Sequence, residues 1–192
     1  MVNPVRKLSA KGLSIMRESA PCANHCRFCS VGPKSFHNIA FDRYAKVVER
    51  FLNWRDQRGL TGFVIAPVQL HTMASMPMKD LKLRFELCRR GGYEPLPLQI
   101  NGLAFRPDDE LKELLLEKKE AGFMSLSLTL AGLGRLHDLW CGRRGEYDFL
   151  MRIAALAGEI GFPRLEKLFL TESSWSGLPE LIETLSRIPG EV

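Results

Sequence analysis

The sequence lacks long apolar runs, and this absence argues against a helical membrane protein. None of its 192 residues belongs to an uncharged apolar stretch of about 18 residues, the length that a membrane-spanning helix requires. The N-terminal stretch carries Arg6, Lys7 and Lys11, but no apolar segment follows them. We therefore expect neither a secretory signal nor a membrane anchor, and the cytoplasm is the default location.

A large excess of charge of one sign is also missing. The 27 basic and 22 acidic residues leave a formal net charge of +5, which permits an anionic partner but gives no clear nucleic-acid signal. No Gly-x-Gly-x-x-Gly follows an apolar run, so a dinucleotide site is not supported. With 45% hydrophobic and 26% charged residues, the composition is that of a globular protein.

Five cysteines are present, and an odd number without a secretory signal argues against a disulfide framework. Three of them, Cys22, Cys26 and Cys29, form a C-x3-C-x2-C motif. Thiolates are soft ligands that select iron–sulfur clusters or zinc. Three thiolates on a four-iron cluster would leave one iron open to a substrate or cofactor, which suits a catalytic cluster.

A zinc site is the alternative, because zinc is also bound by clustered thiolates. A closed structural zinc site has four protein ligands, and no second cysteine pair occurs in this sequence. The fourth ligand would have to come from His25, His37 or Cys141. Cys141 is expected in a loop, whereas Cys88 lies in a helical pattern and is expected to be buried. A non-catalytic zinc or cluster module therefore remains open.

Apolar periodicity predicts strands and helices in alternation along a single domain that covers residues 1–192. Such alternation indicates an α/β fold with a parallel sheet, either a partial (β/α) barrel or a doubly wound sheet. An eight-unit barrel needs about 250 residues, so this chain has room for about six units, of which five are recognisable. We expect strands over 12–17, 63–68, 96–103, 124–130 and 165–170, and helices over 41–58, 78–90, 107–119, 147–160 and 177–188.

The cysteine motif, with Phe28 just before its third cysteine, resembles that of the radical S-adenosylmethionine superfamily. The resemblance implies a [4Fe–4S] cluster on Cys22, Cys26 and Cys29, with S-adenosyl-L-methionine bound to the open iron. It implies reductive cleavage of that cofactor and hydrogen abstraction from a substrate C–H. It further implies a partial (β/α) barrel of five to six units, an electron donor such as flavodoxin or ferredoxin, and a Phe28 ring that covers the cluster and the adenine.

Later segments extend the resemblance. Asn101, in Ile100-Asn101-Gly102, resembles the Thr-Asn-Gly segment of branches that modify peptides or cofactor precursors, and Thr129 stands where those branches have a serine near S-adenosylmethionine. Arg143 and Arg144 are candidates for its carboxylate, because a guanidinium binds a carboxylate bidentately. The resemblance thus implies cofactor contacts at Phe28, Asn101, Thr129, Arg143 and Arg144.

The sequence departs from this family in three places. The second strand continues as residues 65–71 without the family's Gly-Gly-Glu-Pro, where Gln69 or His71 would have to compensate, and Ala131 replaces an aspartate. No cysteine follows Cys141, so no auxiliary-cluster domain is expected. These departures keep open a shortened relative that has lost turnover and works with a partner chain. A partner chain, a second copy or a large substrate would then cover the open barrel edge.

Overall fold

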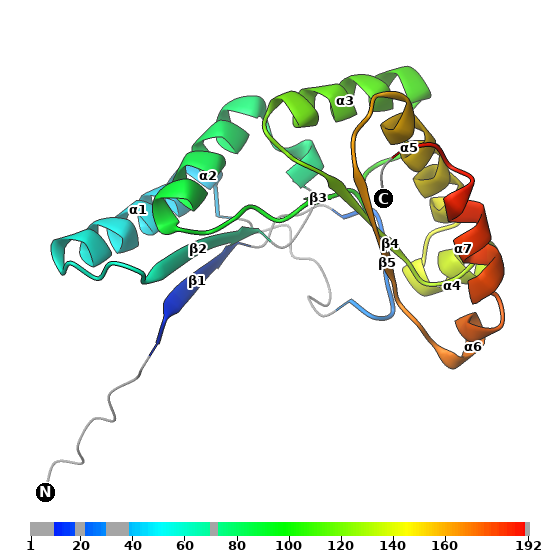
Figure 1. The fold of residues 1–192 in the computed structure, drawn as a ribbon, viewed down its shortest axis with the longest axis horizontal. Helices are drawn as coiled ribbons and strands as arrows, with labels where there is room; N and C mark the ends of the chain where they lie inside the picture. Colours follow the sequence, from blue (N-terminus) through cyan, green and yellow to red (C-terminus); the bar gives the residue numbers. More distant parts are fainter. Residues whose placement is uncertain (1–9, 18–21, 30–38, 70–72, 191–192) are drawn as a thin grey trace, which may run out of the picture.

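The structure is a computed structural model that describes residues 10–17, 22–29, 39–69 and 73–190. Strands and helices alternate along the chain, as expected for an α/β protein (Figure 1). The strands are β1 (Gly12–Arg17), β2 (Val64–Gln69), β3 (Leu98–Gln99), β4 (Leu126–Leu130) and β5 (Arg164–Leu168). The helices are α1 (Phe41–Gln57), α2 (Met78–Gly91), α3 (Asp108–Glu120), α4 (Arg135–Cys141), α5 (Glu146–Glu159), α6 (Glu172–Trp175) and α7 (Leu178–Ser186), with a 3-10 turn, η1 (Met73–Ser75).

The strands form two small parallel sheets. β1 pairs with β2, with Gly12 opposite Val64, and β4 lies between β3 and β5, with Leu126 opposite both Leu98 and Arg164. Within the described ranges no strand pairing joins the two sheets. The 3-10 turn η1, which comes after β2 in the chain, contacts β3 of the other sheet. Figure 1 shows the larger helices α1, α2, α3, α5 and α7 along the outer side of the strands. The chain is therefore a mixed α/β protein without a closed barrel in the part that the structure describes.

Helix α1 shows why these segments become helices that cover the sheets. Its buried residues Tyr44, Val48 and Leu52 recur every fourth position and form one apolar stripe. The Tyr44 hydroxyl donates to the carbonyl of Ile15 at 2.7 Å, which fixes the helix against the end of β1. The stripe thus sets both the burial of α1 and its place on the β1–β2 sheet.

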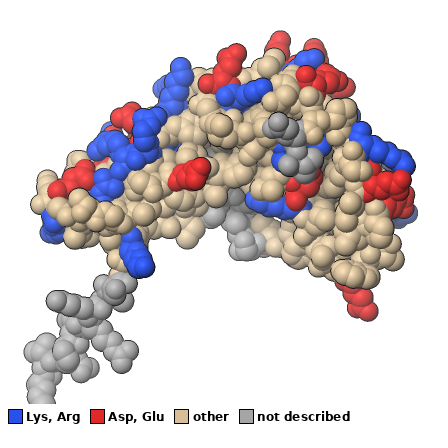
Figure 2. Space-filling view, in the orientation of Figure 1, with Lys and Arg blue, Asp and Glu red and all other residues tan. Residues whose placement is uncertain are grey.

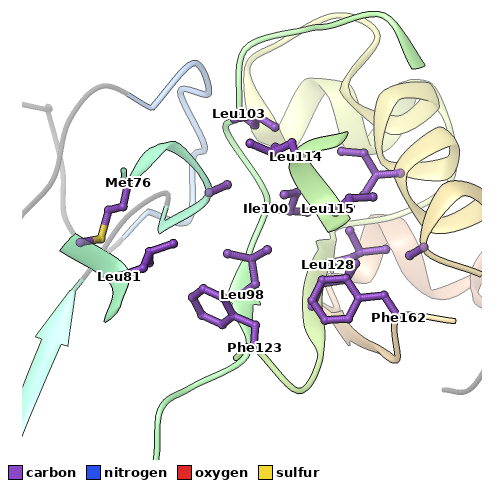
Figure 3. Packing of buried hydrophobic residues seen from close by; sticks show 14 of the residues in the cluster. Met76, Leu81, Leu98, Ile100, Leu103, Leu114, Leu115, Phe123, Leu128 and Phe162 are labelled. Atoms are coloured by element: carbon purple, nitrogen blue, oxygen red, sulfur yellow. The ribbon is translucent and has the colours of Figure 1, made fainter. Parts of the chain in front are cut away.

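A continuous hydrophobic core joins the three-stranded sheet to its helices. Leu98 of β3, Leu128 of β4 and Leu115 of α3 are fully buried, and Ile100 and Phe162 pack beside them (Figure 3). Burial of each such side chain contributes roughly 1.5–3 kcal/mol. This core holds the carboxyl ends of β3 and β4 in place, and those ends carry the site described below.

The predicted elements are found, but the third strand is shorter than expected over 96–103. Pro95 and Pro97 lack an N–H, so the chain before β3 cannot extend the ladder. At the other end the backbone N–H of Leu103 donates to the carbonyl of Ile100, which closes a turn around Asn101. Helices α4 and α6 were not predicted, because seven and four residues are too few for a clear helical period.

The distribution of charged side chains on the surface does not by itself indicate a function. Basic and acidic side chains are interspersed over α1 and α2 on the face shown in Figure 2. None of the described helices is both long enough and apolar enough to cross a membrane. Function therefore has to be sought in specific side-chain arrangements.

Two adjacent leucines of α3, one buried and one exposed, allow a test of which side of this helix faces the hydrophobic core. Leu115 is fully buried, whereas Leu116 is 40% exposed. We expect Leu115→Ala to lower the free energy of unfolding by about 2–5 kcal/mol, because it removes buried methyl groups and leaves a cavity. Leu116→Ala is the matched control, with an expected change below about 1 kcal/mol. Urea unfolding of both variants measures the difference, and equal losses would contradict this packing.

Candidate functional site

The loop that carries the three cysteines, residues 22–29, lies at the carboxyl ends of the three-stranded sheet. The backbone N–H of Ala23 donates to the carbonyl of Gly102, just after β3, at 2.9 Å. The N–H groups of His25 and Arg27 donate to the carbonyls of Cys141 and Trp140, at the end of α4, at 2.8 and 2.9 Å. Parallel α/β sheets bind ligands at this end of their strands.

Two glycines make room for this loop. Gly102 has φ +82°, and a Cβ at this position would lie 2.2 Å from the Cys22 Sγ. Gly142 has φ +63°, and a Cβ there would lie 2.7 Å from the His25 carbonyl oxygen. A larger residue at either position would be strained and would displace the cysteine loop.

A buried polar clamp holds the loop from the other side. Asn24, only 1% exposed, lies between the first two cysteines, and Glu146, fully buried, is the first residue of α5. The Asn24 amide donates to Glu146 Oε1 at 2.8 Å, and the backbone N–H of Gly102 donates to the same oxygen at 3.3 Å. One carboxylate thus connects the cysteine loop, the end of β3 and the start of α5.

Arg143 completes this clamp. Its Nη1 donates to Glu146 Oε2 at 2.9 Å and to the Leu103 carbonyl at 2.6 Å, with a longer contact of 3.4 Å to Asn24 Oδ1. The guanidinium lies 3.4 Å from the centroid of the Phe105 ring, a cation–π arrangement. Arg143 is therefore committed to protein groups, whereas Arg144 is exposed; which of them binds a cofactor carboxylate stays a prediction.

The three motif cysteines are half-buried free thiols. Considering only the described residues, no three His, Cys, Asp or Glu side chains are arranged as the ligands of a metal ion. The donors themselves fit an iron–sulfur cluster, because they are three soft thiols of one short loop. Because Gly102 has no Cβ, the Cys22 Sγ can lie at this position next to the end of β3. The ligand roles of Cys22, Cys26 and Cys29 therefore stay a prediction that this donor set supports.

Cys141 lies at the end of a hydrogen-bonded chain that reaches the motif. The backbone N–H of Ala131, after β4, donates to His137 Nδ1 at 3.0 Å, which assigns the proton of the neutral ring to Nε2. That nitrogen lies 3.3 Å from Cys141 Sγ, and the Cys141 thiol in turn is hydrogen-bonded to Cys26. The hydrogen bond to Cys26, followed by burial, raises the pKa of Cys141, while burial lowers the pKa of His137 to about 4.

The expectation that Cys141 lies in a loop is therefore wrong. It is the last residue of α4 and is only 1% exposed. The cysteine loop packs against it, through the His25 N–H on its carbonyl and Cys26 on its thiol. Of the three candidates for a fourth zinc ligand, Cys141 contacts the motif, and His25 is exposed. His37 lies outside the described residues.

Asn101 and Thr129 lie together at the ends of β3 and β4. The Asn101 side chain donates to the Thr129 carbonyl at 2.8 Å and accepts from the Thr129 N–H at 2.7 Å. Both polar atoms of the Asn101 amide are thereby used to connect the two strand ends. Asn101 thus positions this edge of the sheet, and a cofactor contact by either residue stays a prediction.

Aromatic rings cover one side of the cysteine loop. Phe28 stacks on Phe169, which follows β5, with ring centroids 4.3 Å apart and planes inclined by 22°. Trp140 of α4 lies 6.1 Å from the Phe169 ring. These rings come from three segments and form an apolar wall beside the cysteines. The predicted role of Phe28 in covering a cluster is compatible with this position.

Sequence analysis did not single out Asn24, Glu146 or Phe169. Glu146 gives a signal in retrospect, because it shares the helical face of Phe149, Leu150 and Ile153, all of which are buried. An acid on an apolar face requires a buried partner. The second-strand residues Gln69 and His71 remain untested, because the Gln69 side chain and all of His71 lie outside what the structure describes.

Glu146→Gln tests the clamp. We expect it to lower the free energy of unfolding by about 1–3 kcal/mol, because Arg143 loses its charged partner in a buried site. Glu159→Gln, on the exposed end of the same helix, is the control: its ion pair with Lys112 is at the surface, so a change below about 1 kcal/mol is expected. Chemical denaturation measures both, and equal effects would contradict the clamp.

His137 predicts a pH dependence of stability. Its folded-state pKa of about 4 lies below the ordinary 6.5, so the unfolded state binds the proton more readily. The stabilisation is complete above pH 6.5 and is lost as the pH falls toward 4, by up to about 3 kcal/mol.

The matched variant is His137→Asn, whose side-chain oxygen can still accept the Ala131 N–H. We expect the difference in unfolding free energy between wild type and variant to shrink between pH 6.5 and pH 4. A pH-independent difference would contradict a buried neutral histidine.

Comparison with known proteins assigns no family. No protein-family model matches the chain, and no curated protein sequence matches it. The functional argument therefore depends on the residues and their geometry.

Proposed function

We propose that the chain is a radical S-adenosylmethionine enzyme that abstracts hydrogen from a substrate C–H. The observation that carries this proposal is the loop of three free thiols, Cys22, Cys26 and Cys29, held at the carboxyl ends of parallel strands. Gly102 and the Asn24–Glu146 hydrogen bond give that loop a defined position. A structural metal loop would not require this position at the strand ends.

The roles of the chain's own residues follow from this arrangement. The three thiols would hold a [4Fe–4S] cluster, which together with S-adenosyl-L-methionine supplies a 5′-deoxyadenosyl radical when both are bound. Phe28 and Phe169 would exclude water from this side of the site. Asn101 keeps the Thr129 segment at the edge where the cofactor would bind.

The architecture proposed with this function is a partial (β/α) barrel of five to six units. Two parallel sheets with helices on their outer side support it, and β5 pairs on one edge with β4 in the described sheet. The other edge would admit a large substrate, such as a peptide, or be covered by a partner chain or a second copy. A flavodoxin or ferredoxin would supply the electron.

A second candidate function is a closed, non-catalytic metal site. The contact between Cys141 and Cys26 favours it, because Cys141 would be the fourth thiolate of a zinc or cluster site. The Cys141 sulfur is already engaged by the protein, because it also lies 3.3 Å from the protonated Nε2 of His137. The three-thiolate site is therefore the preferred proposal.

The test is product formation by anaerobically purified protein reconstituted with iron and sulfide. With dithionite and S-adenosylmethionine we expect 5′-deoxyadenosine, and we expect Cys26→Ala to abolish both this product and the cluster's absorbance. Cys88→Ala, which removes a buried thiol of α2 remote in sequence from the motif, is the control and should retain both.

Cys141→Ala separates the two candidate functions. An open three-thiolate site retains iron in this variant, whereas a four-thiolate site loses metal to a similar extent in Cys141→Ala and Cys26→Ala. Stoichiometric zinc in the purified protein, together with no 5′-deoxyadenosine, would contradict the radical mechanism.

A further inference from the structure

An open hollow of about 780 Å³ lies beside the cysteine loop, between that loop, α4 and the start of α5. Arginines from three segments line it: Arg27 of the cysteine loop, Arg135 at the start of α4, and Arg143 and Arg144 of the turn before α5. We propose that this hollow binds a small molecule through a phosphate group, held by Arg27, Arg135 and Arg144. The proposal does not depend on the proposed enzymatic function.

The balance of charge in the hollow favours an anion. Four arginines line it against two aspartates, Asp138 and Asp148. Arg143 is already paired with Glu146, but among the described residues no carboxylate forms an ion pair with Arg27, Arg135 or Arg144. Three guanidinium groups without a described counter-ion around one hollow create a local positive potential that an anionic ligand would neutralise.

One of the two aspartates of the hollow, Asp138, is hydrogen-bonded to backbone N–H groups. Asp138 accepts from the backbone N–H of Gly145 at 2.6 Å through one oxygen and from that of Tyr147 at 2.9 Å through the other. These bonds also occupy N–H groups at the start of α5, so the helix end is not the anion site. The arginines therefore have to provide the binding, and Asp148 is the carboxylate that would oppose it.

Phosphate fits these donors better than a single carboxylate does. Each guanidinium offers parallel N–H donors that match two oxygens of a phosphate, and phosphate has enough oxygens and charge for more than one arginine. A hollow of this volume is in the usual range for one small-molecule ligand. A phosphate-bearing small molecule therefore suits the number and chemistry of the lining groups.

The hollow lies next to the strand-end site and shares the cysteine loop with it. Of the predicted cofactor contacts, Arg143 and Arg144 line the hollow, whereas Phe28, Asn101 and Thr129 do not. Arg27, however, follows Cys26 directly, and its backbone is bonded to Trp140 at the end of α4. A phosphate held here would thus lie against the back of the cysteine loop and anchor the rest of its molecule close to the motif.

Isothermal titration of the 192-residue chain with inorganic pyrophosphate tests the proposal. We expect saturable binding at low ionic strength, weakened about tenfold by Arg135→Gln and more by Arg135→Gln combined with Arg144→Gln. Arg50→Gln, an exposed arginine on α1, is the matched control and should leave the affinity unchanged. Both hollow arginines are exposed, so thermal unfolding of the variants should match wild type.

Citrate provides the comparison between phosphate and carboxylate ligands. Weaker binding of citrate than of pyrophosphate supports the assignment of a phosphate group, and equal binding would overturn it. Pyrophosphate binding that is absent, or that is unaffected in the double variant, would overturn the site. The titration needs neither S-adenosylmethionine nor turnover, so its outcome is separate from that of the 5′-deoxyadenosine assay.

Discussion

The carboxylate of Glu146 is the interaction on which the arrangement of the site depends. It accepts hydrogen bonds from Asn24 of the cysteine loop, from the backbone of Gly102 after β3 and from Arg143 before α5. A fully buried carboxylate is costly unless its oxygens are satisfied. Asn24 of the cysteine loop supplies one of those hydrogen bonds. If the loop were displaced, the buried carboxylate would lose this bond, so the Glu146 interaction stabilises the observed position of the loop.

This constraint explains why the surrounding residues are small or committed to protein groups. Glycine at positions 102 and 142 leaves space for Cys22 and for the backbone of His25, and Arg143 donates through its Nη1 to Glu146 and to the Leu103 carbonyl. The same turn that directs Arg143 inward leaves Arg144 exposed, and Arg144 and Arg27 both line the outer hollow. One short segment therefore has two functions: it fixes the cysteine loop and it contributes cationic side chains to the outer hollow.

Much of the fold could be predicted from the sequence, because the elements of the core repeat their apolar residues at helical or strand spacing. The stripe of α1 and the alternation of Leu126, Leu128 and Leu130 in β4 are such cases. Asn101 and Thr129 were selected only through the family resemblance, and the hydrogen bonds between them could not be predicted from the sequence. Helix α4 could not be predicted, since its seven residues are too few for a clear helical period. Partners remote in sequence, such as Asn24 and Glu146, leave no periodic signal.

The position of Cys141 decides how the motif is best interpreted. A fourth cysteine close to three others would ordinarily favour a closed site, but here its sulfur lies between His137 and Cys26 in a chain that begins at the β4 backbone. A thiol that accepts a hydrogen bond from the neutral imidazole and is hydrogen-bonded to Cys26 is held by protein groups on both sides, and in this position it orients Cys26. The geometry around the fourth cysteine is therefore an argument for three ligands and an open coordination position.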